Sequence, residues 1–296
     1  MSNEAQSLLT PTRLKGLLAK HGVTLKKQLG QNFLVDANVL TQIVDAAEIE
    51  AEDGVFEIGP GAGVVTRLAA LEAKKVIAVE KDRTLQPILK EWLDGLFNVE
   101  VHYADVLKVR LADIWTAFAE CQRVSVIANL PYYITTPILF HLLDSGVPIA
   151  NLVIMVQKEV ADRLMARPGG KDYGALTVAV QYRAQVEPVL QVGPGAFVPP
   201  PAVDSTVVRL RVLASPKVHV RDEQLLFRVV RGAFATRRKT LLNALSAHLG
   251  LPKTTVKEVL ESAGVDPLRR GETLSIEEFA KISDLLVDAA SGQERV

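Results

Sequence analysis

The sequence predicts an α/β protein with an open sheet, followed by a helical C-terminal region. Strand-like apolar runs in the first half of the chain each end in a polar residue, and a glycine-rich turn follows the first of them. After residue 213, strand-like patterning gives way to helical patterning. The 296 residues, 48% of them hydrophobic, suffice for one large core and a smaller one. We therefore expect two domains.

Composition narrows the function classes. The 34 Lys and Arg residues balance the 34 Asp and Glu residues, so the formal net charge is zero and does not attract nucleic acid to the protein as a whole. Any nucleic-acid-binding surface must therefore be a local basic patch. The single cysteine, Cys121, excludes an internal disulfide and a cysteine-rich zinc site, and the five histidines lack paired metal-ligand spacing, so no metal is expected. No secretory leader and no run near the ~18 apolar residues of a membrane span is present, so we expect a soluble, cytoplasmic protein that does not contact a membrane.

The N-terminal part predicts a short helix and a covering segment. Residues 1–25 form a polar lead-in with a helix from Thr12 to His21. Residues 26–34 are too polar for a core and too rich in apolar anchors for a free tail, so we expect them to fold over another part of the molecule. Asp36 then caps a helix whose apolar positions follow a helical period.

The first strand leads into a glycine turn. Residues 55–58 read as a strand, Gly59, Gly61 and Gly63 as a turn, and residues 64–68 as the start of a helix. Glycines at alternate positions let the backbone approach a ligand at a helix N-terminus, where a side chain would collide. The pattern is GxGxG rather than the pyrophosphate fingerprint GxGxxG, which weakens the case for a dinucleotide.

The next two strands each end in a carboxylate. Residues 76–79 lead to Glu80, 21 residues after Gly59, an offset that suits accepting from vicinal ribose hydroxyls. Residues 99–104 lead to Asp105, which can accept from an adenine amino group. Each carboxylate alone is more often a helix cap or a solvated strand end. Together with the glycine turn they indicate a ligand that has an adenosine but no required diphosphate, which favours S-adenosylmethionine over NAD.

The fourth strand, residues 124–128, runs into Asn129-Leu130-Pro131-Tyr132 and Tyr133. Pro131 cannot donate to a sheet ladder, so the strand stops there. An amide that accepts from an amino group, a fixed backbone and a ring that stacks on a base make a plausible nucleobase pocket. The alternative is a strand that ends in a proline turn with two structural tyrosines.

The remaining elements are predicted from periodicity and turn residues. In the sheet region we expect a helix opened by Thr135 or Thr136 with Pro137, then a strand at 152–156 and a helix at 158–167. A loop at 168–174 follows, and strands at 176–183 and 186–192 could pair as a hairpin. An extended proline-rich segment at 197–205 leads into a strand at 206–210. After a linker at 214–217 we expect helices near 222–234, 237–249, 254–263 and 275–289, with capping-box spacing at Thr255/Glu258 and Ser275/Glu278.

A local basic cluster lies in the helical region. Within residues 221–239, six basic residues face two acidic ones. Arg237, Arg238 and Lys239 lie at a predicted helix start, where cations do not favour the helix dipole. This placement indicates phosphate contact, and a solvated charge cluster is the alternative.

Five motifs in order resemble the ribosomal RNA adenine dimethyltransferase family. They are Gln31–Leu34, Glu57–Gly63, Asn129–Tyr132, Phe197–Ser205 and Phe234–Lys239. The resemblance covers roughly residues 20–285 and is strongest to the bacterial branch that modifies small-subunit RNA. It implies a class I S-adenosylmethionine-dependent methyltransferase domain, Rossmann-like with a seven-stranded, mostly parallel sheet, and a small all-α C-terminal domain. The expected boundaries are 1–25 for the lead-in, 26–213 for the catalytic domain and 214–296 for RNA recognition.

The resemblance also implies an activity and its residues. The expected activity is methyl transfer from S-adenosylmethionine to N6 of two adjacent adenines near the 3′ end of 16S ribosomal RNA, by a monomer that acts on the small ribosomal subunit late in its biogenesis. Cofactor contacts are expected at Asn32, Leu34, Gly59, Gly61, Gly63, Glu80, Asp105 and Asn129. The target adenine is expected at Asn129, Leu130, Pro131 and Tyr132. RNA contacts are expected at Lys26, Lys27, Arg231, Arg237, Arg238 and Lys239.

Three alternatives remain open at this point. A large-subunit (23S) dimethyltransferase of the macrolide-resistance type has similar cofactor motifs. The protein could instead be a ribosome-assembly factor, for which binding to the subunit matters more to the cell than methylation. An NAD oxidoreductase is disfavoured by the GxGxG spacing and by the lack of an obvious hydride-transfer site.

Overall fold

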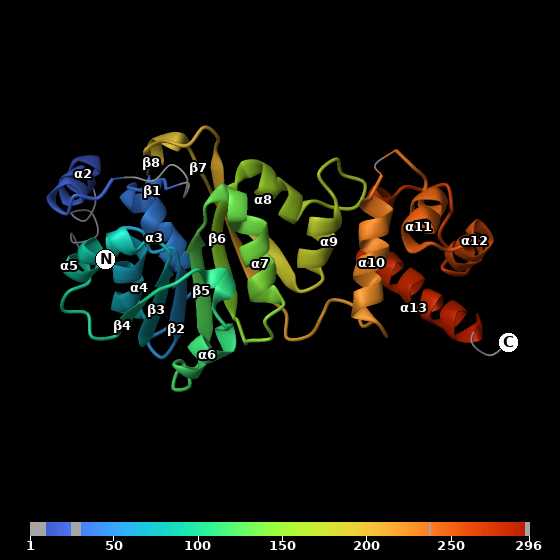
Figure 1. The fold of residues 1–296 in the computed structure, drawn as a ribbon, viewed down its shortest axis with the longest axis horizontal. Helices are drawn as coiled ribbons and strands as arrows, with labels where there is room; N and C mark the ends of the chain where they lie inside the picture. The colour runs from blue at the N-terminus through green and yellow to red at the C-terminus, as the bar shows by residue number, and fades with distance from the viewer. Residues whose placement is uncertain (1–9, 25–30, 237, 294–296) are drawn as a thin grey trace. The chain divides into compact units, whose positions relative to one another are not determined.

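A computed structural model describes residues 10–24, 31–236 and 238–293 (Figure 1). The chain divides into two compact units, residues 1–161 with 186–212 and residues 162–185 with 213–296. The predicted C-terminal domain, 214–296, falls within the second unit, which also contains residues 162–185. None of the described helices is both long enough and apolar enough to cross a membrane.

The first unit is built on a seven-stranded sheet in the order β4-β3-β2-β5-β6-β9-β7. Its strands are β2 (Gly54–Ile58), β3 (Lys75–Glu80), β4 (Val99–Tyr103), β5 (Val124–Asn129), β6 (Asn151–Gln157), β7 (Ala184–Val192) and β9 (Ser205–Val212). The five strands from β4 to β6 pair in parallel, and β9 is antiparallel to β6. The predicted mostly parallel, seven-stranded sheet is therefore confirmed.

Helices cover both faces of this sheet. Successive residues of a strand point to opposite faces, so Val55 joins the core shared with the N-terminal helices, while the Phe56 ring meets Trp115 at a centroid distance of 5.4 Å. Burial on both faces explains why the central strands are continuous apolar runs. The helices of this unit are α2 (Pro11–Lys20), α3 (Ala37–Ala46), α4 (Val64–Glu72), α5 (Gln86–Trp92), α6 (Leu111–Thr116), α7 (Thr135–Leu143) and the start of α8 (Lys158–Met165).

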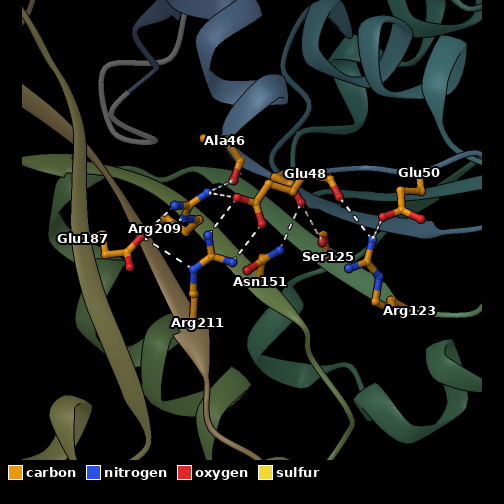
Figure 2. A network of polar contacts seen from close by, with 10 residues as sticks. Ala46, Glu48, Glu50, Arg123, Ser125, Asn151, Glu187, Arg209 and Arg211 are labelled. Atoms are coloured by element: carbon orange, nitrogen blue, oxygen red, sulfur yellow. Dashed lines mark hydrogen bonds and ion pairs between the residues drawn. The ribbon is translucent and has the colours of Figure 1, made fainter.

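A polar network ties together the edge of the sheet where the parallel strands begin (Figure 2). Arg209 and Arg211 of β9 bind the Glu48 carboxylate, and Arg209 also binds Glu187 at 2.6 Å. Arg123, just before β5, pairs with buried Asp53 at 2.8 Å and with Glu50 at 3.0 Å. Asn151 and Ser125 donate to the Ala47 carbonyl. We call these residues the amino-edge network.

The second unit has its own core around α10 (Glu223–Phe234). The other helices are α9 (Ala175–Gln181), α11 (Leu241–Leu249), α12 (Lys253–Ser262) and α13 (Ile276–Gln293). The four predicted C-terminal helices are present, but α11 begins at Leu241 after Thr240, so Arg238 and Lys239 precede the helix. At α13 the Ser275/Glu278 capping box forms with both bonds. The Thr255/Glu258 box is wrong, because α12 starts at Lys253.

The predicted strand at 176–183 is also wrong, because residues 175–181 form helix α9. The run is short and apolar almost throughout, and periodicity alone cannot distinguish a buried strand from a buried helix of this length. Thr177 helps to start the helix, since its hydroxyl accepts from the Gly174 N–H at 3.1 Å and donates to the Arg163 carbonyl at 2.6 Å. Val178 and Tyr182 then pack into the core around α10. The predicted hairpin partner of β7 is therefore absent from this segment.

Candidate active site

A cavity in the first unit lies where the parallel strands end, the usual ligand position in open α/β sheets. Most of the predicted site residues line it: Asn32, Leu34, Gly59, Gly61, Glu80, Asp105, Asn129, Leu130, Pro131 and Tyr132. Gly63 is not in the lining. A Cβ there would lie 2.9 Å from Leu89 Cδ2, so this glycine lets α4 pack against α5. Arg231, Arg238 and Lys239 are exposed residues of the second unit, and Lys26, Lys27 and Arg237 lie outside the described residues.

The glycine turn presents bare backbone to the cavity. Gly59 and Gly61 have φ of 72° and 58°, a region that side chains disfavour. A Cβ at Gly61 would lie 3.1 Å from the Phe33 ring. The turn therefore leaves backbone close to any bound ligand without an intervening side chain.

Glu80, at the end of β3, is held by backbone donors. Its carboxylate accepts from the Gly61 N–H at 3.1 Å and from the Asp82 N–H at 2.7 Å. The residue is buried, and this burial raises the pKa of Glu80. A carboxylate has about four acceptor positions, so Glu80 keeps acceptor capacity for ligand hydroxyls.

Glu57 is a site residue that the sequence motif contained but the prediction did not assign. It lies in β2, lines the cavity and is 4% exposed. Within the described structure, its Oε2 atom makes no well-formed hydrogen bond, although the neighbouring Thr66 hydroxyl opposes burial by lowering the pKa of Glu57. Burial raises the pKa of Glu57 to about 8, and the charge of Glu80 adds to this effect. A buried polar atom without a partner in a cavity wall is what a ligand donor would satisfy. The sequence feature that could have identified Glu57 as a site residue is an acidic residue within the otherwise apolar strand β2.

Asp105 is the electrostatic opposite of Glu57. One oxygen accepts from the Leu107 N–H at 3.2 Å, as the cap of the 3₁₀ turn η3 (Val106–Lys108), and the other accepts from Lys81 Nζ at 2.9 Å. The hydrogen bond from Lys81 lowers the pKa of Asp105. Asp105 therefore stays ionised as an acceptor, and Lys81, which also lines the cavity, was not predicted.

The exit of β5 supplies the second half of the cavity wall. Asn129 ends the strand, and Leu130 and Pro131 lead into the 3₁₀ turn η4 (Tyr132–Ile134). The Tyr132 ring is partly buried and its hydroxyl lies 2.6 Å from Ser205 Oγ, whereas Tyr133 is 61% exposed. The two tyrosines are therefore not equivalent, and only Tyr132 is anchored in the wall.

A small flap completes the cavity. Strand β1 (Phe33–Leu34) pairs antiparallel with β8 (Phe197–Val198), and Gln31 donates to Asp82 at 2.8 Å. Of residues 26–34, which are predicted to fold over another part of the molecule, residues 31–34 line the cavity, and residues 26–30 lie outside the described residues. The Phe197 ring also lines the cavity. The sequence included it in a motif without assigning it to the site, because its place depends on the β1–β8 pairing.

These groups fit an adenosine-bearing amino-acid cofactor. The site combines two carboxylates at strand ends, a glycine-rich turn, a buried carboxyl with one unbonded oxygen and apolar walls that include Leu85, Val106 and Ile138. Across the described part of the chain, no group of three or more His, Cys, Asp or Glu side chains is arranged to hold a metal ion.

Comparison with known proteins gives consistent matches. A family model described as "Ribosomal RNA adenine dimethylase" matches residues 22–286. Ribosomal RNA small subunit methyltransferase A of Bacillus mycoides (strain KBAB4) is 52% identical over 286 residues, which cover 95% of this chain and 98% of that protein. A dimethyladenosine transferase from Plasmodium falciparum has a similar crystal structure, with TM-score 0.72, 28% identity and coverage of 88% and 98%. The 23S rRNA methyltransferase ErmE matches with TM-score 0.66, 28% identity and coverage of 86% and 100%.

Proposed function

The chain belongs to the ribosomal RNA adenine dimethylase family, and we propose from this premise how its site performs the reaction and on which RNA. It is an S-adenosylmethionine-dependent ribosomal RNA adenine N6,N6-dimethyltransferase. Its substrate is 16S ribosomal RNA of the small subunit, at two adjacent adenines near the 3′ end. The observation that carries the site assignment is the single cavity that joins Glu80 and Asp105 to the Asn129–Tyr132 wall.

Small-subunit RNA is favoured over large-subunit RNA by the relatives. Proteins named for the small subunit share 52% of residues over 95% of this chain, whereas ErmE, named for 23S rRNA, shares 28%. We further propose that the protein acts as a monomer in the cytoplasm. An NAD oxidoreductase is not consistent with the family.

The cofactor would lie along the glycine turn. Glu80 would accept from its ribose hydroxyls, Asp105 from its adenine amino group, and Gly59, Gly61, Asn32 and Leu34 would surround it. When bound, S-adenosylmethionine supplies a methyl group activated on a sulfonium centre. Glu57, which is buried and lacks a partner for Oε2, is placed to meet a donor of the same ligand.

The wall from Asn129 to Tyr132 would hold the target base. The N6 lone pair of adenine is delocalised into the ring, so the nitrogen is a poor nucleophile. Asn129 Oδ1 and the Leu130 carbonyl would accept hydrogen bonds from N6–H, two in the first methylation and one in the second, and localise the lone pair. N6 would lose one proton to solvent with each methyl group it gains. Pro131 fixes the backbone that carries this carbonyl, and Tyr132 would stack on the flipped-out base, a contact worth ~1–3 kcal/mol. Orientation of this kind can contribute ~7–11 kcal/mol, so no strong general base is required.

RNA contact outside the cavity would come from exposed cations of the helical unit, of which Arg238 and Lys239 lie just before a helix start, where cations do not favour the helix dipole. Arg238 and Lys239 are exposed and precede α11, and Arg231 is exposed in the last turn of α10. We propose phosphate contacts for these three residues and for Lys26, Lys27 and Arg237. Each lost phosphate contact would reduce the slope of log affinity against log salt by about 0.7–0.9.

The deciding experiment incubates the protein with unmethylated small subunits and labelled S-adenosylmethionine and maps the label. Label on N6 of two adjacent adenines near the 3′ end of 16S RNA is expected, with large subunits as the control. Label on large subunits alone would reject the substrate assignment. If an inactive Asn129→Ala protein restored late subunit assembly in cells as well as the wild type, binding rather than catalysis would be the essential activity.

A further inference from the structure

Ser205 lies where the ligand cavity meets an antiparallel strand. It is the first residue of β9 and pairs with Gln157, the last residue of β6. Because β9 runs against its parallel neighbours, its beginning lies at the edge where they end. The first residue of this antiparallel strand therefore lies at the edge of the sheet that carries the cavity. Ser205 is fully buried, with 0% exposure.

The Ser205 hydroxyl is bonded to Tyr132, the less exposed of the two tyrosines that line the cavity. Its Oγ lies 2.6 Å from the Tyr132 hydroxyl, within the range of a good O–H···O bond. The backbone on either side of Ser205 is fixed, since Asp204 accepts from the Lys158 N–H at 3.0 Å and the following residues pair with β6. The serine is thus a rigid anchor, and the far end of the Tyr132 side chain is held in one place.

Anchoring the hydroxyl restricts the ring. The Cα of Tyr132 is fixed by η4, which follows Pro131 directly. With both ends held, the ring axis cannot swing about χ1, so the position of the ring beside the cavity is set. Its hydroxyl is already engaged, so Tyr132 does not need to bond the base. Tyr133, next in sequence and 61% exposed, has no comparable burial.

We propose that Ser205 is a positioning residue that holds the Tyr132 ring in the pose that receives the target adenine. This inference rests on the proposed function, which places the adenine on Tyr132. Ser205 does not touch the substrate and acts only through the phenol. Its effect is therefore confined to the RNA substrate and leaves cofactor binding unchanged.

The test is a double-mutant cycle of Tyr132→Phe and Ser205→Ala, each of which deletes one partner of the bond. We measure kcat and KM for the RNA substrate, affinity for S-adenosylhomocysteine and the melting temperature. Each single variant is expected to lower kcat/KM about three- to tenfold, the range for one net hydrogen bond. The double variant is expected to match the singles, because the bond can be lost only once. S-adenosylhomocysteine affinity is expected to stay within twofold of the wild type.

A spectroscopic readout separates positioning from general loss of structure. With 2-aminopurine in place of the target adenine, stacking on Tyr132 quenches the fluorescence, and both single variants are expected to weaken this quenching equally. Ser125→Ala is the matched control. Ser125 is also a buried serine, 2% exposed, and its hydroxyl donates to the Ala47 carbonyl at 3.1 Å in the amino-edge network. It is expected to lower the melting temperature without changing kcat/KM or quenching.

Two outcomes would overturn the inference. Effects of Tyr132→Phe and Ser205→Ala that multiply in the double variant would mean that the residues act independently. Wild-type kcat/KM and quenching in Ser205→Ala would mean that the bond does not position the ring. Tyr132→Ala distinguishes these from a failure of the proposed function: full RNA turnover in that variant would remove Tyr132 from the base site altogether.

Discussion

The two edges of the sheet use the same residue types in opposite ways. In the amino-edge network, carboxylates meet guanidinium groups, and the hydrogen bonds from Arg211 and Arg209 lower the pKa of Glu48 and Glu187 respectively. At the carboxyl edge, burial raises the pKa of Glu57 and Glu80, and one carboxyl oxygen of Glu57 lacks a partner in the described structure. Charges that satisfy one another hold the fold together. At the carboxyl edge, carboxyl oxygens that can still accept hydrogen bonds lie in the cavity where the ligand would bind.

The amide side chains give the sharpest contrast between the edges. Asn129→Ala removes the proposed acceptor for N6–H, and we expect kcat to fall about 10²–10³-fold, as for loss of one preorganised polar group. Affinity for S-adenosylhomocysteine should fall only modestly. Asn151→Ala is the control at the other edge, where the buried amide donates to Ala47 at 3.2 Å. It should lower the melting temperature and leave kcat unchanged. Near-normal turnover of Asn129→Ala would reject the assignment.

The buried carboxyl of Glu57 predicts a dependence of stability on pH. Its folded pKa of about 8 lies above the ordinary value of 4.5, so the folded state holds the proton more tightly and stability falls as pH rises between these values. From pH 4.5 to 7 this group alone would cost about 3 kcal/mol of unfolding free energy. Glu57→Gln should remove this slope, as measured by urea unfolding across the range.

Glu48→Gln provides the opposite sign. Arg211 lowers the folded pKa of Glu48, so its contribution is complete above the unfolded pKa and is lost as pH falls through the folded pKa. The variant should therefore be less stable than the wild type at neutral pH, with the difference shrinking in acid. The same slope in both variants would remove the electrostatic distinction between the edges.

Breaking the amino-edge network should affect stability and not chemistry. Arg209 contacts Glu48, Glu187 and the Ala46 carbonyl, and its side chain is 19% exposed. Arg209→Ala leaves two partly solvated carboxylates close together, so we expect a loss of about 1–2 kcal/mol by urea unfolding, between the values for surface and buried pairs. Turnover below the melting transition should match the wild type. A large drop in kcat would show that the network also shapes the cavity.

Sequence reasoning succeeded where a local rule determined the structure. Pro131 ends β5 because it cannot donate to the ladder, and Asp36 caps α3 through bonds to its own neighbours. Glu80 and Asp105 reach the cavity because parallel strands end at one edge. These residues needed no knowledge of long-range pairing.

The missed residues depend on contacts between distant segments. Phe197 joins the site through β1–β8 pairing, and Ser205 meets Tyr132 because β9 lies beside β6 in antiparallel register. Neither register could be read from periodicity. The helix at 175–181 was missed for a related reason: its burial against α10 decides its form, and the run is too short for its period to decide.

The smallest predicted effect concerns the ion pair between Lys81 and Asp105 in the cavity wall. Lys81 is half exposed and bonds Asp105 at 2.9 Å, and exposed pairs of this kind are worth ~0.2–1 kcal/mol. Lys81→Met should therefore weaken S-adenosylhomocysteine binding no more than about fivefold at pH 7, because Asp105 stays ionised there without its partner. In acid the difference should widen, since the pKa of Asp105 returns toward its ordinary value and the carboxylate is protonated at a higher pH than in the wild type.

The control is Lys74→Met, which removes a similar pair with Glu52 at 2.8 Å near the start of β3. This variant should bind S-adenosylhomocysteine as the wild type does at every pH. If titration calorimetry found equal acid dependence in both variants, Asp105 would not contact the cofactor and would serve only as the cap of η3.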